Sequence, residues 1–115
     1  EHTIKDGLYT RKVSMPKNHL VISYIHKQNH PSFFLKGKMS VLLDDGTVKV
    51  LTAPMVVQTE VGTQRVAFMH EDCEWACVYK VKSKTVKEAE KEIYTYDYRE
   101  LPKKVTSKKI DLCQE

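Results

Sequence analysis

The chain has 115 residues, with 19 Lys and Arg side chains against 15 Asp and Glu, for a formal net charge of +4. One domain is the expectation at this length, and 41% hydrophobic with 30% charged residues excludes wholesale disorder. No apolar run approaches the roughly 18–20 residues of a membrane span, so no membrane partner is expected. The charge is too small to indicate nucleic-acid binding by itself, and none is expected.

The first 80 residues or so predict one strand after another. Residues 8–15 (LYTRKVSM) and 19–26 (HLVISYIH) alternate apolar and polar side chains with the period of a strand. In the second segment we expect four side chains to share one face: Leu20, Ile22, Tyr24 and His26. Further strands are expected over residues 32–36, 38–43, 47–51, 55–60, 64–69 and 75–82.

The strongest local signal is Asp44-Asp45-Gly46, which separates two of these strands. Asp-Gly supplies the positive φ that a tight hairpin turn needs. Many short strands separated by turns indicate an all-β protein, either a sandwich or a barrel. We therefore expect residues 1–84 to form one β-barrel.

Residues 85–115 are expected to form a helix and a basic tail, an appendage to the barrel rather than a second domain. The segment 85–93 (TVKEAEKEI) predicts the helix, because Thr85 and Glu88 have the spacing of a capping box. Three tyrosines follow at period two, and we expect them to form an edge strand or to contact a second subunit: Tyr94, Tyr96 and Tyr98.

Three cysteines, an odd number, argue against a closed disulfide framework. Cys73 and Cys77 would lie roughly 13 Å apart on a strand, beyond disulfide reach. We expect free thiols, as in a reducing compartment, and no secretion signal is visible at the N-terminal end. The expected location is the cytoplasm.

Two segments resemble the conserved motifs of the cupin superfamily. Residues 24–46 (YIHKQNHPSFFLKGKMSVLLDDG) resemble the first motif, and residues 51–70 (LTAPMVVQTEVGTQRVAFMH) the second, with Gly37 and Gly62 on the family's glycines. The resemblance implies a small cupin-like antiparallel β-barrel, also described as a double-stranded β-helix or jelly roll. The chain is also similar to the small cupin-like proteins of tailed bacteriophages. That similarity implies a viral protein in the host cytoplasm, with a host or virion protein as a partner.

The family's metal site uses three His and one Glu, and the corresponding positions here are Tyr24, His26, His30 and Arg65. His26 and His30 can chelate a divalent metal such as Zn, Fe, Mn or Ni, although two ligands alone make a weak site. Arg65 has no lone pair to donate, and its charge repels a metal ion. The resemblance therefore implies a degenerate metal site.

Without a metal, the same four side chains suit an anionic small molecule. The guanidinium of Arg65 would anchor the anion, and Tyr24, His26 and His30 would orient it. We therefore predict a non-enzymatic binding protein with its ligand in the barrel mouth. An alternative is that Arg65 pairs with Glu60 or another acid and that the histidines form hydrogen bonds inside a filled barrel.

Two further functions stay open. One is a cupin metalloenzyme, an isomerase or dioxygenase, with its metal on His26 and His30. The other is a protein-interaction module that uses the surface and the tail. The resemblance also implies a homodimer, since cupins are commonly dimers.

Overall fold

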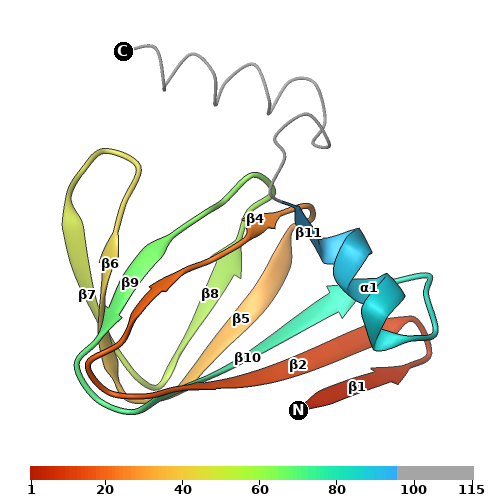
Figure 1. Ribbon diagram of the computed structural model, residues 1–115, viewed down its shortest axis with the longest axis horizontal. Coiled ribbons are helices and arrows are strands. Elements are labelled where there is room, and N and C mark those ends of the chain that lie inside the picture. The colour runs from red at the N-terminus through yellow and green to blue at the C-terminus, as the bar shows by residue number, and fades with distance from the viewer. Residues whose placement is uncertain (96–115) are drawn as a thin grey trace.

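In the computed structural model, which describes residues 1–95, two antiparallel sheets face each other across a common interior (Figure 1). The five-stranded sheet has the order β1 (His2–Lys5), β2 (Leu8–Met15), β10 (Cys73–Lys80), β5 (His30–Lys36) and β8 (Met55–Thr59). The four-stranded sheet has the order β3 (Leu20–Ile22), β9 (Val66–Met69), β6 (Lys38–Leu42) and β7 (Val48–Thr52). A short pair of β11 (Tyr94–Thr95) with β4 (Ile25–His26), and the helix α1 (Val86–Ile93), complete the described chain. The predicted all-β barrel with one C-terminal helix is confirmed.

The hairpin of β6 and β7 forms where Asp44-Asp45-Gly46 predicted it. The two strands pair from Lys38 opposite Thr52 to Leu42 opposite Val48. Gly46 has a φ of +86°, and the carboxylate of Asp45 accepts hydrogen bonds from the amide and the hydroxyl of Thr47. The turn is therefore stabilised by the residues from which it was predicted, Asp45 and Gly46.

The strand predicted over residues 19–26 is divided into β3 and β4 by an irregular step at residues 23 and 24. Leu20 and Ile22 are 65% and 66% exposed on the outside of the barrel, whereas His26 lines its interior. The prediction that these three side chains share one face is wrong, because the irregular step reverses the inward and outward alternation. β1 is an element that the sequence pattern did not predict.

The helix α1 packs on the end of the barrel where β2 begins and β10 ends (Figure 1). Its N-cap is Thr85, as predicted, and the Thr85 hydroxyl accepts a hydrogen bond from the amide of Glu88. Ala89 and Ile93 are fully buried there, in a cluster with Tyr9, Tyr79 and Val81. Within residues 1–95 no helix is long and apolar enough to cross a membrane. Tyr96, Tyr98 and Cys113 lie outside the described residues.

The outer face of the four-stranded sheet is largely apolar. Two rows of cross-strand neighbours run over it, Leu20–Phe68–Ser40–Val50 and Ile22–Val66–Leu42–Val48. The expected homodimer and the expected host or virion partner stay predictions.

Candidate functional site

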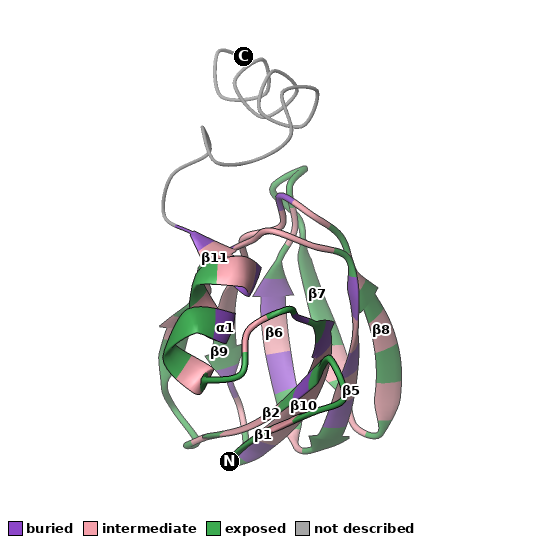
Figure 2. Ribbon diagram, turned by 90° about the vertical axis from the view of Figure 1, so that its right-hand side faces the viewer, coloured by how far each residue is buried: buried purple, intermediate pink, exposed green. Residues whose placement is uncertain are grey.

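The two sheets leave a space between them that side chains do not fill. On β8 the inward residues Met55, Val57 and Thr59 are only half-buried, and they alternate with exposed residues (Figure 2). An interior cavity of about 530 Å³ lies between the sheets, within the usual range for small-molecule sites. The barrel is therefore hollow, unlike the filled barrel considered above.

One row of inward side chains crosses the five-stranded sheet at the middle of this cavity. Arg11 lies opposite Cys77, Cys77 opposite Ser32, and Ser32 opposite Val57. The Ser32 hydroxyl lies 2.9 Å from the Thr59 hydroxyl and 3.5 Å from the Cys77 Sγ. The row thus places one cation beside a group of small polar side chains.

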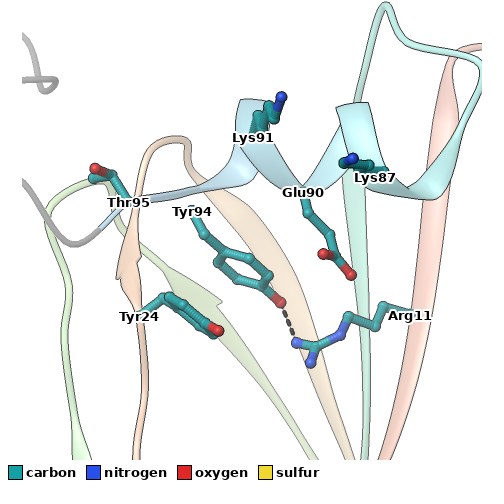
Figure 3. A pocket seen from close by; sticks show the side chains of 7 residues that line it. All are labelled: Arg11, Tyr24, Lys87, Glu90, Lys91, Tyr94 and Thr95. Atoms are coloured by element: carbon teal, nitrogen blue, oxygen red, sulfur yellow. Dashed lines mark hydrogen bonds between the residues drawn. The ribbon is translucent and has the colours of Figure 1, made fainter.

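Arg11 is held at this place by Tyr94. Its Nη1 donates a hydrogen bond to the Tyr94 hydroxyl, and its Cζ lies 5.2 Å from the centroid of the Tyr94 ring (Figure 3). Its Nε is buried and has no hydrogen-bond partner. No carboxylate within residues 1–95 forms an ion pair with Arg11, although Glu90 lies beside it (Figure 3). The charge of Arg11 is therefore uncompensated by any ion pair in the described part of the chain.

Arg65, the cation that the sequence singled out, has an acid partner. Its Nη1 lies 2.9 Å from the Asp44 carboxylate, and the same nitrogen lies 3.3 Å from the carbonyl oxygen of Gln64. The backbone amide of Arg65 donates to the hydroxyl of Ser23. Arg65 lines the cavity, but its guanidinium already has the Asp44 carboxylate as an ion-pair partner.

The two histidines lie side by side, with ring centroids 4.8 Å apart. His26 lines the cavity, whereas His30 is 2% exposed and packs behind it, 4.3 Å from the ring centroid of Tyr79. The Nδ1 of His30 lies 3.3 Å from the carbonyl oxygen of Gln28, to which it can only donate. The Nδ1 of His26 and the Nε2 of His30 are buried without a hydrogen-bond partner.

Burial keeps these side chains uncharged. Burial, together with the nearby His30, Arg11 and Arg65, lowers the pKa of His26 to about 4. Burial also lowers the pKa of His30 and raises the pKa of Tyr94. At neutral pH the imidazoles are therefore neutral and the Tyr94 phenol is protonated, so neither histidine adds a positive charge to those of Arg11 and Arg65.

The residues present do not fit a tightly held metal ion. Neutral His26 and His30, each with a free ring nitrogen, would suit a metal. However, residues 1–95 contain no group of three or more His, Cys, Asp or Glu side chains placed to hold one. Arg11 and Arg65 also make a cation costly at this end of the cavity. The four positions that resemble the family's ligands do not form a metal-binding set.

Tyr24 stands between the interior cavity and a second hollow, which we call the side recess. Its ring stacks on Tyr94 with centroids 4.9 Å apart and an angle of 21° between the planes. The side recess measures about 330 Å³ and lies under α1 (Figure 3); its walls comprise Arg11, Tyr24, Lys87, Glu90, Lys91, Tyr94 and Thr95. Arg11, Tyr24 and Tyr94 line both hollows and so form the partition between them.

Of the predicted site residues, Tyr24, His26 and Arg65 line the interior cavity, and His30 lies behind it. Arg11 was missed. A signal for it existed, because residues 8–15 alternate and Arg11 falls on the same face as Tyr9, Val13 and Met15. A lone arginine among the apolar and aromatic residues on one face of a strand is therefore a candidate anchor for an anionic ligand.

Known structures share this architecture. A cupin-2 domain protein from Shewanella frigidimarina superposes with a TM-score of 0.53 at 12% identity, over 68% of this chain and 74% of that one. An acetylacetone dioxygenase from Acinetobacter johnsonii gives 0.53 at 20% identity, over 64% of this chain and 51% of that one. The cupin-2 domain of an XRE-family transcriptional regulator from Enterobacter cloacae gives 0.52 at 10% identity, over 67% and 84%.

These likenesses establish that the chain has the cupin fold. No protein-family model and no curated protein matches the sequence. Since the structural neighbours include both an enzyme and a regulator, the shared fold assigns no activity, and function has to be argued from the cavity.

Proposed function

We propose that this chain, with its cupin fold, is a non-enzymatic binding protein that holds a small anionic molecule in the interior cavity. The observation that carries the proposal is Arg11, a cavity-lining guanidinium with a buried, unpartnered Nε and no ion pair within residues 1–95. A partly buried charge without a counter-charge costs free energy in the empty protein. A bound anion would remove that cost, so the empty cavity favours anionic occupants.

The ligand-contacting roles follow from where each side chain lies. Arg11 is the anchor, because Asp44 already partners Arg65. The planar guanidinium can present two parallel N–H donors to a carboxylate or a phosphate. His26 offers a neutral imidazole on the cavity wall, and Tyr24 offers an aromatic face. His30 would support His26 from behind rather than contact the ligand.

The other two functions have less support. A metalloenzyme needs more donors than His26 and His30 supply within residues 1–95. An interaction module acting through the tail concerns residues beyond 95. Neither is favoured by a specific contact in the described part of the chain.

The test is a thermal-denaturation screen of the wild type against octanoate, benzoate, citrate, inorganic phosphate and adenosine monophosphate. A ligand at about 100 times its Kd stabilises by about 2.7 kcal/mol, which raises the Tm by several degrees in a domain of this size. We expect at least one anion to produce this shift in the wild type. We expect none to do so in Arg11→Met, while Arg65→Met keeps most of the shift.

Arg11→Met and Arg65→Met each remove one positive charge from the cavity wall. Comparing them distinguishes loss of the ligand anchor from a general loss of positive charge. Arg11→Met removes a cation that lacks an ion pair but also removes the hydrogen bond to Tyr94, so urea denaturation of the variant is the control that lost binding does not reflect unfolding. If no anion raises the Tm of the wild type, or if Arg11→Met keeps the full shift, the proposal is wrong.

A further inference from the structure

The interior cavity changes from polar to apolar along its length. Four neighbouring strands contribute inward residues in the same order: Tyr9, Arg11, Val13 and Met15 on β2; Tyr79, Cys77, Trp75 and Cys73 on β10; His30, Ser32 and Phe34 on β5; Thr59, Val57 and Met55 on β8. The polar members lie toward α1 and β4, and the apolar members lie at the opposite end (Figure 1). Arg11 stands where the two halves meet.

The apolar half contains every methionine of the chain. All four line the cavity: Met15, Met39, Met55 and Met69. Methionine is unbranched and polarizable, so a methionine-rich wall adapts to apolar ligands of differing shape. The four-stranded sheet adds Val21, Ala67 and Val41 from one cross-strand row, which ends at the exposed Lys49.

Trp75, the single tryptophan of the chain, also lines this half. It stacks on Phe34 with ring centroids 4.6 Å apart and planes within 4° of parallel. Phe34 is fully buried, whereas Trp75 is only half-buried. Burying the remaining apolar surface of Trp75 and its neighbours under a ligand is favourable.

Within residues 1–95, Arg11 is the guanidinium at the junction that has no ion pair; the acids nearby are the exposed Glu60, which lines the cavity, and Glu90, which lies beside Arg11 in the side recess. Asp44 partners Arg65, Lys49 is exposed to solvent on an edge strand, and burial keeps His26 neutral. One uncompensated guanidinium matches one carboxylate. Along β2, Arg11 and Met15 are four residues apart, roughly 13 Å, which suits an apolar body of about eight carbon atoms.

The geometry points to an amphipathic monocarboxylate as the ligand class, with its carboxylate on Arg11 and its apolar body along the methionine-lined half. This inference rests on the proposed function and narrows it. The proposed function requires only that an anion bind in the cavity. The narrower inference also requires that a longer apolar chain on the ligand increase its affinity.

The experiment uses the fluorescence of Trp75, which the ligand body would contact. Butanoate, hexanoate, octanoate and decanoate are titrated below their aggregation concentrations, with 1-octanol and octylammonium as neutral and cationic matches for octanoate. We expect Kd to fall about three- to fourfold per added methylene until the apolar half is filled. We expect 1-octanol to bind at least tenfold more weakly than octanoate and octylammonium to bind more weakly still.

Two variants on β8 test where the apolar body of the ligand lies. Met55→Gln places an amide on the cavity wall, and Val56→Gln makes the same type of change on the outer face, where Val56 is 64% exposed. Met55→Gln should weaken octanoate binding about tenfold and leave butanoate unchanged, while Val56→Gln should change neither. Circular dichroism confirms that both variants are folded.

The two proposals fail differently. If short anions and citrate bind with dependence on Arg11 but chain length adds nothing, the monocarboxylate class is wrong and the proposed function stands. If 1-octanol binds as tightly as octanoate, the carboxylate is not recognised and the class is again wrong. If no anion of any length binds, both proposals are wrong.

Discussion

Arg11 and Tyr94 are hydrogen-bonded across 83 positions of the chain, with the Arg11 Nη1 donating to the Tyr94 hydroxyl. Arg11 belongs to β2, near the start of the barrel, and Tyr94 belongs to β11, where its backbone pairs with His26. The bond therefore fixes the guanidinium from the far end of the described chain. Because the cation is held before a ligand arrives, less conformational entropy is lost on binding.

The first prediction is that Arg11 and Tyr94 are energetically coupled. In a double-mutant cycle of Arg11→Met and Tyr94→Phe, the free energy of unfolding should give a coupling of about 1–2 kcal/mol, as for a hydrogen bond to a charged group. Urea denaturation of the four proteins measures it. Tyr94→Phe alone should be destabilising, since it leaves a second Arg11 nitrogen without an acceptor. Additive effects would contradict the observed bond.

The second prediction concerns pH, through the lowered pKa of His26. His26 faces His30 from β5, Tyr94 from β11, Arg11 from β2 and Arg65 from the segment before β9. Its pKa is about 4 in the folded protein, against 6.5 as its ordinary value. Between pH 6.5 and pH 4 the unfolded chain binds more protons than the folded protein. The free energy of unfolding therefore falls as the pH is lowered from 6.5 toward 4, and above pH 6.5 it does not depend on the titration of His26.

The expected loss is about 2 kcal/mol between pH 7.5 and pH 5, measured by urea denaturation at intermediate pH values. His26→Gln should flatten most of this dependence, and His30 adds a loss of the same sign because its pKa is also lowered. His19→Gln, at an exposed position, serves as the matched control and should leave the profile unchanged. A profile that is equally steep in His26→Gln would show that other groups cause it.

The third prediction compares two glycines with positive φ. A Cβ on Gly37, at φ +106°, would lie 2.5 Å from the carbonyl oxygen of Asp72 and 2.7 Å from the Cys73 Sγ. Gly46, at φ +86°, has nothing within 4 Å of that position. Gly37→Ala should therefore cost about 2–4 kcal/mol from backbone strain plus overpacking, and Gly46→Ala only about 1 kcal/mol from strain. Equal costs in urea denaturation would mean that the close approach at Gly37 relaxes freely.

The fold could be predicted because its signals are local. The alternation in residues 8–15 gave β2 with its observed bounds, and Asp45-Gly46 marked the hairpin turn. The divided strand could not be predicted in this way. An irregular step at residues 23 and 24 reverses which side chains face inward, and no local pattern marks it.

The site was only partly predictable, for the same reason. The resemblance placed the charge of Arg65 at the site. In the structure Arg65 forms an ion pair with Asp44, 21 residues away, and no local sequence pattern predicts this contact. Arg11 lies outside both motif segments and reaches the cavity only because β2 pairs with β10. The alternation of residues 8–15 could have assigned Arg11 to the inward face, although this assignment was not made, whereas its lack of an ion pair depends on the three-dimensional structure.

The fourth prediction uses Cys77, whose strand register places it between Arg11 and Ser32 on the cavity wall. In a Cys113→Ser background, Cys77 should be alkylated much faster than Cys73, which is 1% exposed. Iodoacetate and iodoacetamide both form an S–C bond and release iodide, but only iodoacetate carries a carboxylate. A cation beside the thiol should favour iodoacetate over iodoacetamide by roughly tenfold more than in a free thiol.

Peptide mapping by mass spectrometry gives the rate at each cysteine for both reagents. The preference for iodoacetate at Cys77 should disappear in Arg11→Met and persist in Arg65→Met, because Asp44 already partners Arg65. Octanoate, if it occupies the cavity, should slow both reagents at Cys77 in the wild type. The same ratio of rates in the wild type and Arg11→Met would mean that the charge of Arg11 does not act in the cavity, and the anchoring role assigned to it would have to be abandoned.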